Sequence, residues 1–218
     1  MDKGIYIGDA VKFGWKTMKA NGGFFICLLL AFWLITVGSQ ILAGFLEERI
    51  ISLSIIFYII AIVLEFALTL GFIKICIMFC DNQKVTIGDL FSCFHLFRKY
   101  VYATILYMVI VVVGFVLLIF PGVIWAIKFG FYPYFIVDKN QGVIDSLKAS
   151  SRITMGAKWD LLGFCFVVFI INLLGMVCLI IGLFATVPTT MVAIALIYRK
   201  LLSQTESPQP QATEATAA

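Results

Sequence analysis

Long apolar stretches separated by short polar segments make up most of this chain. A helix needs roughly 20 apolar residues to cross a bilayer. The tracts at residues 100–137 and 161–202 are each too long for one crossing, so each is expected to turn back on itself. Pro121-Gly122 and Pro188 mark these expected turns, and Glu47-Glu48-Arg49 marks the turn after the first crossing.

The pattern predicts an all-α fold, a polytopic membrane bundle of about six transmembrane helices. The predicted spans are 24–46, 54–79, 100–120, 122–137, 161–184 and 189–202. They belong to a predicted membrane domain of residues 1–202. Residues 203–218 are polar and carry too few apolar side chains to offset the entropy of ordering, so they are predicted to form a disordered cytoplasmic tail.

Three short segments with apolar residues at helical spacing each precede a long apolar stretch. They open with Ile7-Gly8-Asp9, Ile87-Gly88-Asp89 and Val143-Ile144-Asp145. Asp9, Asp89 and Asp145 fit helix starts, where a carboxylate caps free backbone N–H groups and meets the positive end of the helix dipole. The segments predict three cytoplasmic interfacial amphipathic helices. Their order fits a threefold internal repeat, and it fits equally well the alternative that short interfacial helices simply connect the spans.

The composition excludes a soluble domain. Hydrophobic residues make up 62% of the 218 residues and charged residues only 13%, whereas charged residues make up about 25% of soluble proteins. Six crossings leave no room for a separate catalytic domain. The segment before Asn21 is polar and basic and lacks a short apolar core with a cleavage site, so the first span is expected to stay in the mature chain.

The net charge of +4 is unevenly distributed along the chain. With both termini in the cytoplasm, nearly all Lys and Arg residues outside the spans face the cytoplasm, and Arg49 is the exception. The positive-inside rule therefore predicts an even number of passes with both termini inside. We expect the basic residues to meet anionic lipid headgroups at the cytoplasmic face, and no basic domain supports binding to nucleic acid.

Glu65 lies midway along the second predicted span, and Lys128 lies in the fourth. A charge near the bilayer centre costs at least about 2.5 kcal/mol, so Glu65 is expected to face the bundle interior, to be neutral or to be paired. The depths of the two residues permit a Glu65–Lys128 pair, which is the candidate intramembrane polar site. A structural pair, or a neutral Glu65 hydrogen-bonded in the bundle, is favoured over a proton or solute relay, because no second acid lies within a predicted span.

Sequence motifs for catalysis are missing. The chain has no Gly-x-Ser-x-Gly elbow, no His-Glu-x-x-His, no Walker loop and no dinucleotide fingerprint. Cys76 and Cys80 share a helical face, but no second thiol pair or histidine cluster completes a zinc site, and His95 is the single histidine. We therefore predict a protein that is not an enzyme, with no catalytic residue, no metal and no cofactor.

Several short motifs in the second half of the chain form a pattern. They are Pro121-Gly122, the stretch Phe131-Tyr132-Pro133-Tyr134-Phe135-Ile136-Val137-Asp138, the stretch Asp145-Ser146-Leu147-Lys148-Ala149-Ser150, and Thr154-Met155-Gly156. This order resembles the bacterial membrane-protein superfamily that includes the YciC-like proteins and the membrane domain of some glycerophosphoryl diester phosphodiesterases. Gly182, Pro188 and Tyr198 are similar to its closing hairpin. The resemblance implies a six-helix inner-membrane domain of unassigned function, without the phosphodiesterase chemistry of the attached soluble domain.

The favoured function is that of a non-catalytic integral membrane protein, an accessory, scaffold or assembly factor that acts through its cytoplasmic helices on a membrane-protein partner. The alternative is a small transporter or lipid-handling protein that uses Glu65 and Lys128. Pro121 and Pro188 lie at predicted span ends, so the broken midplane helices typical of transporters are not predicted. The expected location is the bacterial inner membrane, with multiple passes and both termini in the cytoplasm.

Overall fold

The computed structural model describes residues 6–47, 51–177 and 182–206, and these residues form helices without any strand. The α-helices are α1 (Ile7–Ala20), α2 (Gly22–Glu47), α3 (Ile51–Cys80), α4 (Phe97–Leu117), α5 (Ile119–Phe129), α6 (Tyr132–Lys139), α7 (Val143–Ile153), α8 (Lys158–Val177) and α9 (Leu183–Glu206); two short 3-10 helices are η1 (Ile87–Leu90) and η2 (Phe94–Leu96). Six helical segments are long and apolar enough to cross a membrane, with α5 and α6 together forming one of them. The predicted all-α polytopic class is confirmed.

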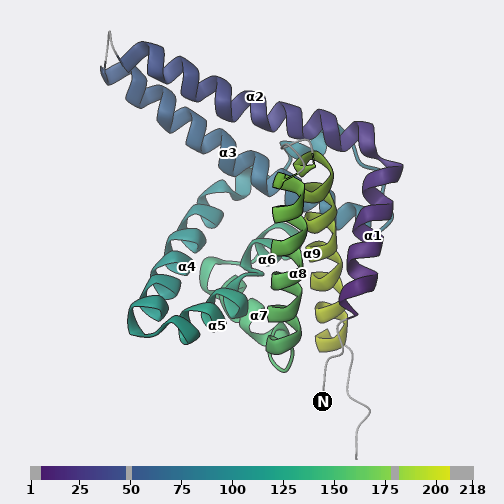
Figure 1. The fold of residues 1–218 in the computed structure, drawn as a ribbon. Helices are drawn as coiled ribbons and strands as arrows, with labels where there is room; N and C mark the ends of the chain where they lie inside the picture. Colours follow the sequence, from purple (N-terminus) through teal and green to yellow (C-terminus); the bar gives the residue numbers. More distant parts are fainter. Residues whose placement is uncertain (1–5, 48–50, 178–181, 207–218) are drawn as a thin grey trace, which may run out of the picture.

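Helix α9 lies between α8 and α1, and α1, α3 and α8 all pack against it (Figure 1). Small and hydroxyl side chains make up much of its buried surface, among them Thr189, Thr190, Ala193 and Ala195. Such residues let neighbouring helices approach closely, as is usual inside membrane bundles, where lipid competes for the large aliphatic side chains. The packing of the bundle therefore centres on its last helix.

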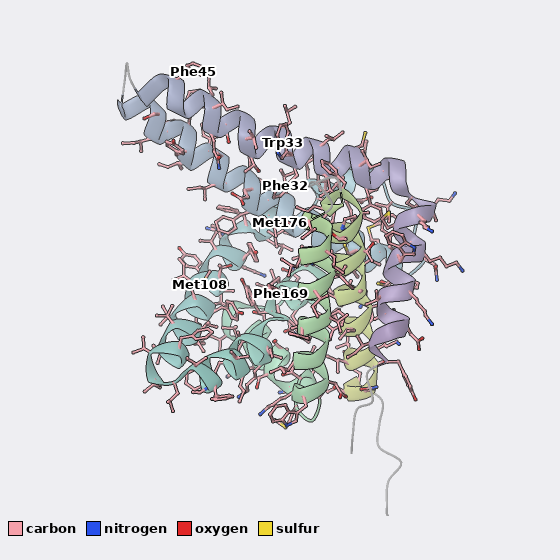
Figure 2. All side chains as sticks on the ribbon, in the orientation of Figure 1. Phe32, Trp33, Phe45, Met108, Phe169 and Met176 are labelled. Atoms are coloured by element: carbon pink, nitrogen blue, oxygen red, sulfur yellow. The ribbon has the colours of Figure 1, made fainter. Side chains whose placement is uncertain are left out.

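Helices α2 and α3 pack on each other as a long hairpin whose turn end projects away from α8 and α9, whereas the C-terminal half of α3 packs in the bundle against α9 (Figure 1). In the most apolar stretch of α2 only 6% of the residues are buried, compared with 56% in α9. Figure 2 shows Trp33 and Phe45 on this hairpin, and they are 58% and 74% exposed. Most of the surface of α2, and of the part of α3 near the turn, is thus available to lipid or to another chain.

The predicted turn at Pro121-Gly122 is displaced in the structure. Leu118 is the extended residue between α4 and α5, and Pro121 lies in the first turn of α5. Proline is tolerated there because the first N–H groups of a helix have no partner within the helix. Gly114 packs against the backbone of Gly122, where a Cβ atom on either residue would collide with the other helix. The two helices therefore turn back closely on each other just before the predicted position.

The predicted turn at Pro188 is wrong, because Pro188 lies inside α9. Its missing N–H leaves one carbonyl of the preceding turn without its helical partner, and membrane helices tolerate such gaps when hydroxyl groups and neighbouring helices compensate. The carbonyl freed by Pro188 is that of Phe184; the nearby Thr189 and Thr190 hydroxyls donate to other carbonyls of this turn, those of Ala185 at 2.7 Å and Val187 at 3.0 Å. Helix α9 also continues to Glu206, beyond the predicted end of the membrane domain at 202. The remainder of the predicted tail, and Glu48-Arg49 of the first turn, lie outside the described residues.

The three short segments precede α2, α4 and α8 in the predicted order, but the middle one differs from the prediction. Residues 87–96 form η1 and η2 instead of an amphipathic α-helix. Helix α1 packs against α9, with Gly14 so close to the Thr189 carbonyl that a Cβ atom would collide with it. Helix α7 packs against α4, α5, α6 and α9. The first and third segments are therefore held by protein contacts.

Candidate functional site

A polar groove lies between the two helices of the projecting hairpin. We call it the α2–α3 groove, and its lining residues are Thr36, Ser39, Gln40, Tyr58, Ala61, Ile62 and Glu65. Its volume is about 210 Å³. The Thr36 hydroxyl is buried and has no hydrogen-bond partner among the described residues, while the Ser39 hydroxyl donates to the Thr36 carbonyl at 2.9 Å. Hydroxyl, amide and carboxyl groups thus gather in a hairpin that is otherwise almost entirely apolar.

Glu65 is the single acidic residue of the α2–α3 groove, and its side chain is exposed. The backbone carbonyl of Glu65 accepts a 2.8 Å hydrogen bond from the Thr69 hydroxyl, but the described residues place no cation against the Glu65 carboxyl. A carboxyl group inside a bilayer is costly unless it finds a partner, by at least about 2.5 kcal/mol. The Glu65 carboxyl in the groove therefore still needs a polar partner if it lies inside the bilayer.

The predicted Glu65–Lys128 pair does not form within the chain. Lys128 lies in the last turn of α5, and its Nζ atom is 5.1 Å from the ring centroid of Phe129. Helix α3 packs mainly against α2, α9 and α6, whereas α5 packs against α4, α7 and α8. A matching depth along two helices does not make them neighbours, and here the chain topology separates them.

A second polar cluster joins three helices that are distant in sequence. We call it the Arg199 cluster, and its members are Asp81, just after α3, Asp138 of α6, and Tyr198 and Arg199 of α9. Arg199 donates to both carboxylate oxygens of Asp138, at 2.8 and 2.9 Å, and to Asp81 at 2.6 Å. The side chains of Arg199, Asp81 and Asp138 are 25%, 30% and 13% exposed. The planar guanidinium suits such two-pronged binding of carboxylates.

Aromatic rings support the Arg199 cluster from the bundle side. The Tyr198 hydroxyl donates to Asp138 at 2.9 Å, and the Tyr198 ring stacks on Tyr134 and meets the edge of Phe135, with both centroids 5.2 Å away. Tyr198 is completely buried. The rings fix the position of Asp138 and the cluster pins α3, α6 and α9 together. We assign it a structural role.

The fourth apolar segment is broken between α5 and α6, and α7 closes the break. The Ser150 hydroxyl donates to the Lys128 carbonyl at 2.9 Å and accepts from the Phe131 N–H at 3.0 Å. The Thr154 hydroxyl also reaches the Lys128 carbonyl, at 3.2 Å. Backbone groups freed by a helix break can bind ions or substrates in transporters. Here side chains of α7 already occupy them.

The three aspartates predicted at helix starts lie in different settings. Asp9 and Asp145 lie in the first turns of α1 and α7, where a carboxylate meets the positive helix end, but neither helix has a side-chain hydrogen bond from its N-cap residue. Asp89 accepts hydrogen bonds from the backbone N–H and the hydroxyl of Thr86, both at 2.8 Å. Asp89 therefore stabilises the start of η1 from its third position, in a capping box with Thr86.

The sequence pattern did not point to the Arg199 cluster or to the gathering of polar residues around Glu65. A signal for the cluster was present, because Asp81, Asp138 and Arg199 all lie where apolar stretches approach the predicted cytoplasmic face. Opposite charges at one predicted depth are candidates for pairing. Within the described residues, no group of three or more His, Cys, Asp or Glu side chains is arranged to hold a metal ion.

Comparison with known proteins identifies the family. Residues 18–218 match the family described as domain of unknown function DUF7847, so the chain belongs to that family. No curated protein and no solved structure matches the chain. The family description carries no function, and the resemblance to the YciC-like superfamily stays a prediction.

Proposed function

We propose that this member of the DUF7847 family is a non-catalytic membrane protein, an accessory, scaffold or assembly factor that binds a membrane-embedded partner through its α2–α3 hairpin. This differs from the expectation drawn from the sequence, which placed binding on the cytoplasmic helices. Those helices are engaged within the chain, since α1 packs against α9 and α7 packs against four other helices.

The observation that carries the proposal is the α2–α3 groove with Glu65 on a hairpin that projects from the bundle (Figure 1). Large apolar side chains cover the hairpin, and lipid alone satisfies them. Lipid tails do not satisfy a carboxyl, an amide and a hydroxyl in the same groove. A helix of another chain that carries a polar side chain at this depth would contact the apolar side chains of the hairpin and also bind the polar groups of the groove.

Site-specific photocrosslinking in native membranes tests the proposal. A photoreactive residue at Leu34 or Ile62 of the hairpin, which are 67% and 52% exposed, is expected to yield a discrete protein adduct. The matched control is Phe169 of α8, which is 62% exposed (Figure 2) and is expected to yield lipid adducts. Lipid adducts alone at all three positions would contradict a hairpin partner.

A small transporter or lipid-handling protein is the second candidate, and the groove volume of about 210 Å³ favours it because a small polar molecule fits there. This candidate now depends on Glu65 without Lys128. The closed break between α5 and α6 weighs against it. Flux into vesicles that contain the purified protein, lost in Glu65→Gln, would favour transport over partner binding.

We place the protein in the bacterial inner membrane with both termini in the cytoplasm, on the strength of the resemblance and the positive-inside rule. The exposed lysines of α1, such as Lys12, Lys16 and Lys19, then meet anionic headgroups. A cysteine introduced at Lys84, which is exposed, should react with an impermeant thiol reagent only from the cytoplasmic side. A cysteine at Glu48, outside the described residues, should react only from the other side, and the opposite result would reverse the orientation.

A further inference from the structure

We infer that the hairpin partner is a second copy of this chain, in which Glu65 of each copy pairs with Lys128 of the other. The inference rests on the proposed function and identifies the partner. Among the described residues of one chain, no cation lies against Glu65 and no carboxylate lies against Lys128, although both belong to segments long and apolar enough to cross the membrane. Two unpaired, opposite charges on one chain are complementary between two copies.

The depths of the two residues agree. Glu65 lies 11 residues after Ser54, where its apolar span begins, and Lys128 lies 9 residues after Ile119, where the fourth begins. At 1.5 Å per residue these are about 16 Å and about 14 Å from the same predicted face. The difference is less than one helical turn.

The Glu65 side chain is exposed and the Lys128 side chain is half-buried. The turn between α2 and α3 and the turn between α4 and α5 both lie away from α8 and α9, at the upper left and the lower left of Figure 1, whereas α3 packs against α9 and α5 packs against α8. Exposed apolar side chains lie on both hairpins, including Ile59 and Ile62 on α3 and Met108 and Val112 on α4, all between 52% and 56% exposed. A twofold axis places the α2–α3 hairpin of each copy against the α4–α5 hairpin of the other, because an interface of this symmetry repeats every contact twice.

Charge reversal distinguishes a pair between copies from a pair within one chain. Differently tagged wild-type copies, co-expressed and extracted in mild detergent, are expected to capture each other. Glu65→Lys alone and Lys128→Glu alone each place like charges in both contacts of a twofold dimer, so self-capture should fall about tenfold or more. Co-expression of the two single variants should restore capture, because both contacts then join opposite charges. Lys12→Glu, an exposed lysine on α1, is the control and should leave capture unchanged.

Each outcome decides the question. Rescue by the double variant Glu65→Lys with Lys128→Glu, without rescue by mixing the single variants, would show a pair within one chain and overturn the inference. If a charge reversal does not accumulate, a photoreactive residue at Ile62 in the otherwise wild-type chain should crosslink to a peptide from α4 or α5 of a second copy. Crosslinking to a different protein would overturn the inference that the partner is a second copy of this chain, but it would leave the proposed function intact. The absence of any protein adduct would overturn both.

Discussion

The α2–α3 hairpin and helix α9 are both apolar, but they differ in how much of their surface is buried within the protein. Helix α2 is the more apolar of the two, yet 6% of its most apolar stretch is buried within the protein, compared with 56% in α9. Helix α9 achieves this burial with threonine, alanine and proline facing its neighbours. Hydropathy thus measures affinity for the bilayer, and small side chains mark the surface that other helices cover.

The polar residues follow this division only in part, because buried polar atoms without a hydrogen-bond partner among the described residues also occur outside the hairpin, at Gln141, Asn172, Thr186 and the Nε atom of Arg199. In the core, Arg199 binds two aspartates, and Ser150 and Thr154 satisfy the backbone at the α5–α6 break. On the hairpin, the Thr36 hydroxyl and the Glu65 carboxyl have no such partners among the described residues. Satisfied polar groups hold a bundle together, whereas an exposed carboxyl within a span, such as that of Glu65, indicates a surface that is completed by something else.

The largest difference in the free energy of unfolding is expected when a leucine is replaced by alanine in each of the two regions. Leu201→Ala in α9, where the side chain is fully buried, should lower the free energy of unfolding by about 3 kcal/mol because it leaves a cavity. Leu34→Ala on the hairpin, where the side chain is 67% exposed, should change it by less than about 0.5 kcal/mol. Denaturant unfolding in mixed micelles measures both. Equal losses would mean that the hairpin is buried against the bundle in solution.

The contact between α1 and α9 should be sensitive to one added side chain. Gly14→Val forces α1 away from the Thr189 carbonyl and should cost about 2 to 3 kcal/mol and raise hydrogen exchange throughout α1. Gly8→Val is the matched control, because a Cβ atom there meets no neighbour within 4 Å. If both variants exchange like the wild type, α1 is held by the membrane surface instead of by α9.

Removal of the Arg199 guanidinium should weaken the packing of α3, α6 and α9 against one another. Arg199→Ala leaves two carboxylates facing each other and should cost about 2 kcal/mol, less than in a fully buried ion pair because water still reaches this cluster. Lys200→Ala, on the next residue of the same helix, serves as control and should cost under about 0.5 kcal/mol. Thermal unfolding monitored by circular dichroism compares them, and equal midpoints would remove the structural role of the Arg199 cluster.

The smallest of these effects is expected at the α5–α6 break. Ser150→Ala removes one acceptor and one donor from the broken backbone and should cost about 1 kcal/mol, since the Thr154 hydroxyl still reaches the Lys128 carbonyl. Ser151→Ala is the control. Hydrogen exchange at Phe131 reports the opening directly. Unchanged protection there would indicate that water, not α7, satisfies the break.

The sequence alone determined the class of this protein, because the number and length of apolar stretches follow from the thickness of the bilayer. It also identified Glu65 and Lys128 as costly residues within spans, since their cost depends on depth and not on neighbours. It placed the turns at Pro121 and Pro188 wrongly, because proline is compatible with the first turn of a helix and with a compensated helix interior.

Only the tertiary structure decided which helices are neighbours. The Glu65–Lys128 pair within one chain was a prediction from matching depths, and it failed because α3 and α5 do not pack on each other. The Arg199 cluster joins residues that are 61 and 118 positions apart, and the α2–α3 groove forms from two helices facing each other. A periodic pattern records what each helix face prefers to contact, but lipid and protein offer nearly the same apolar surroundings inside a membrane. The choice between them depends on the fit of particular side chains across each interface, which emerges when the helices pack together.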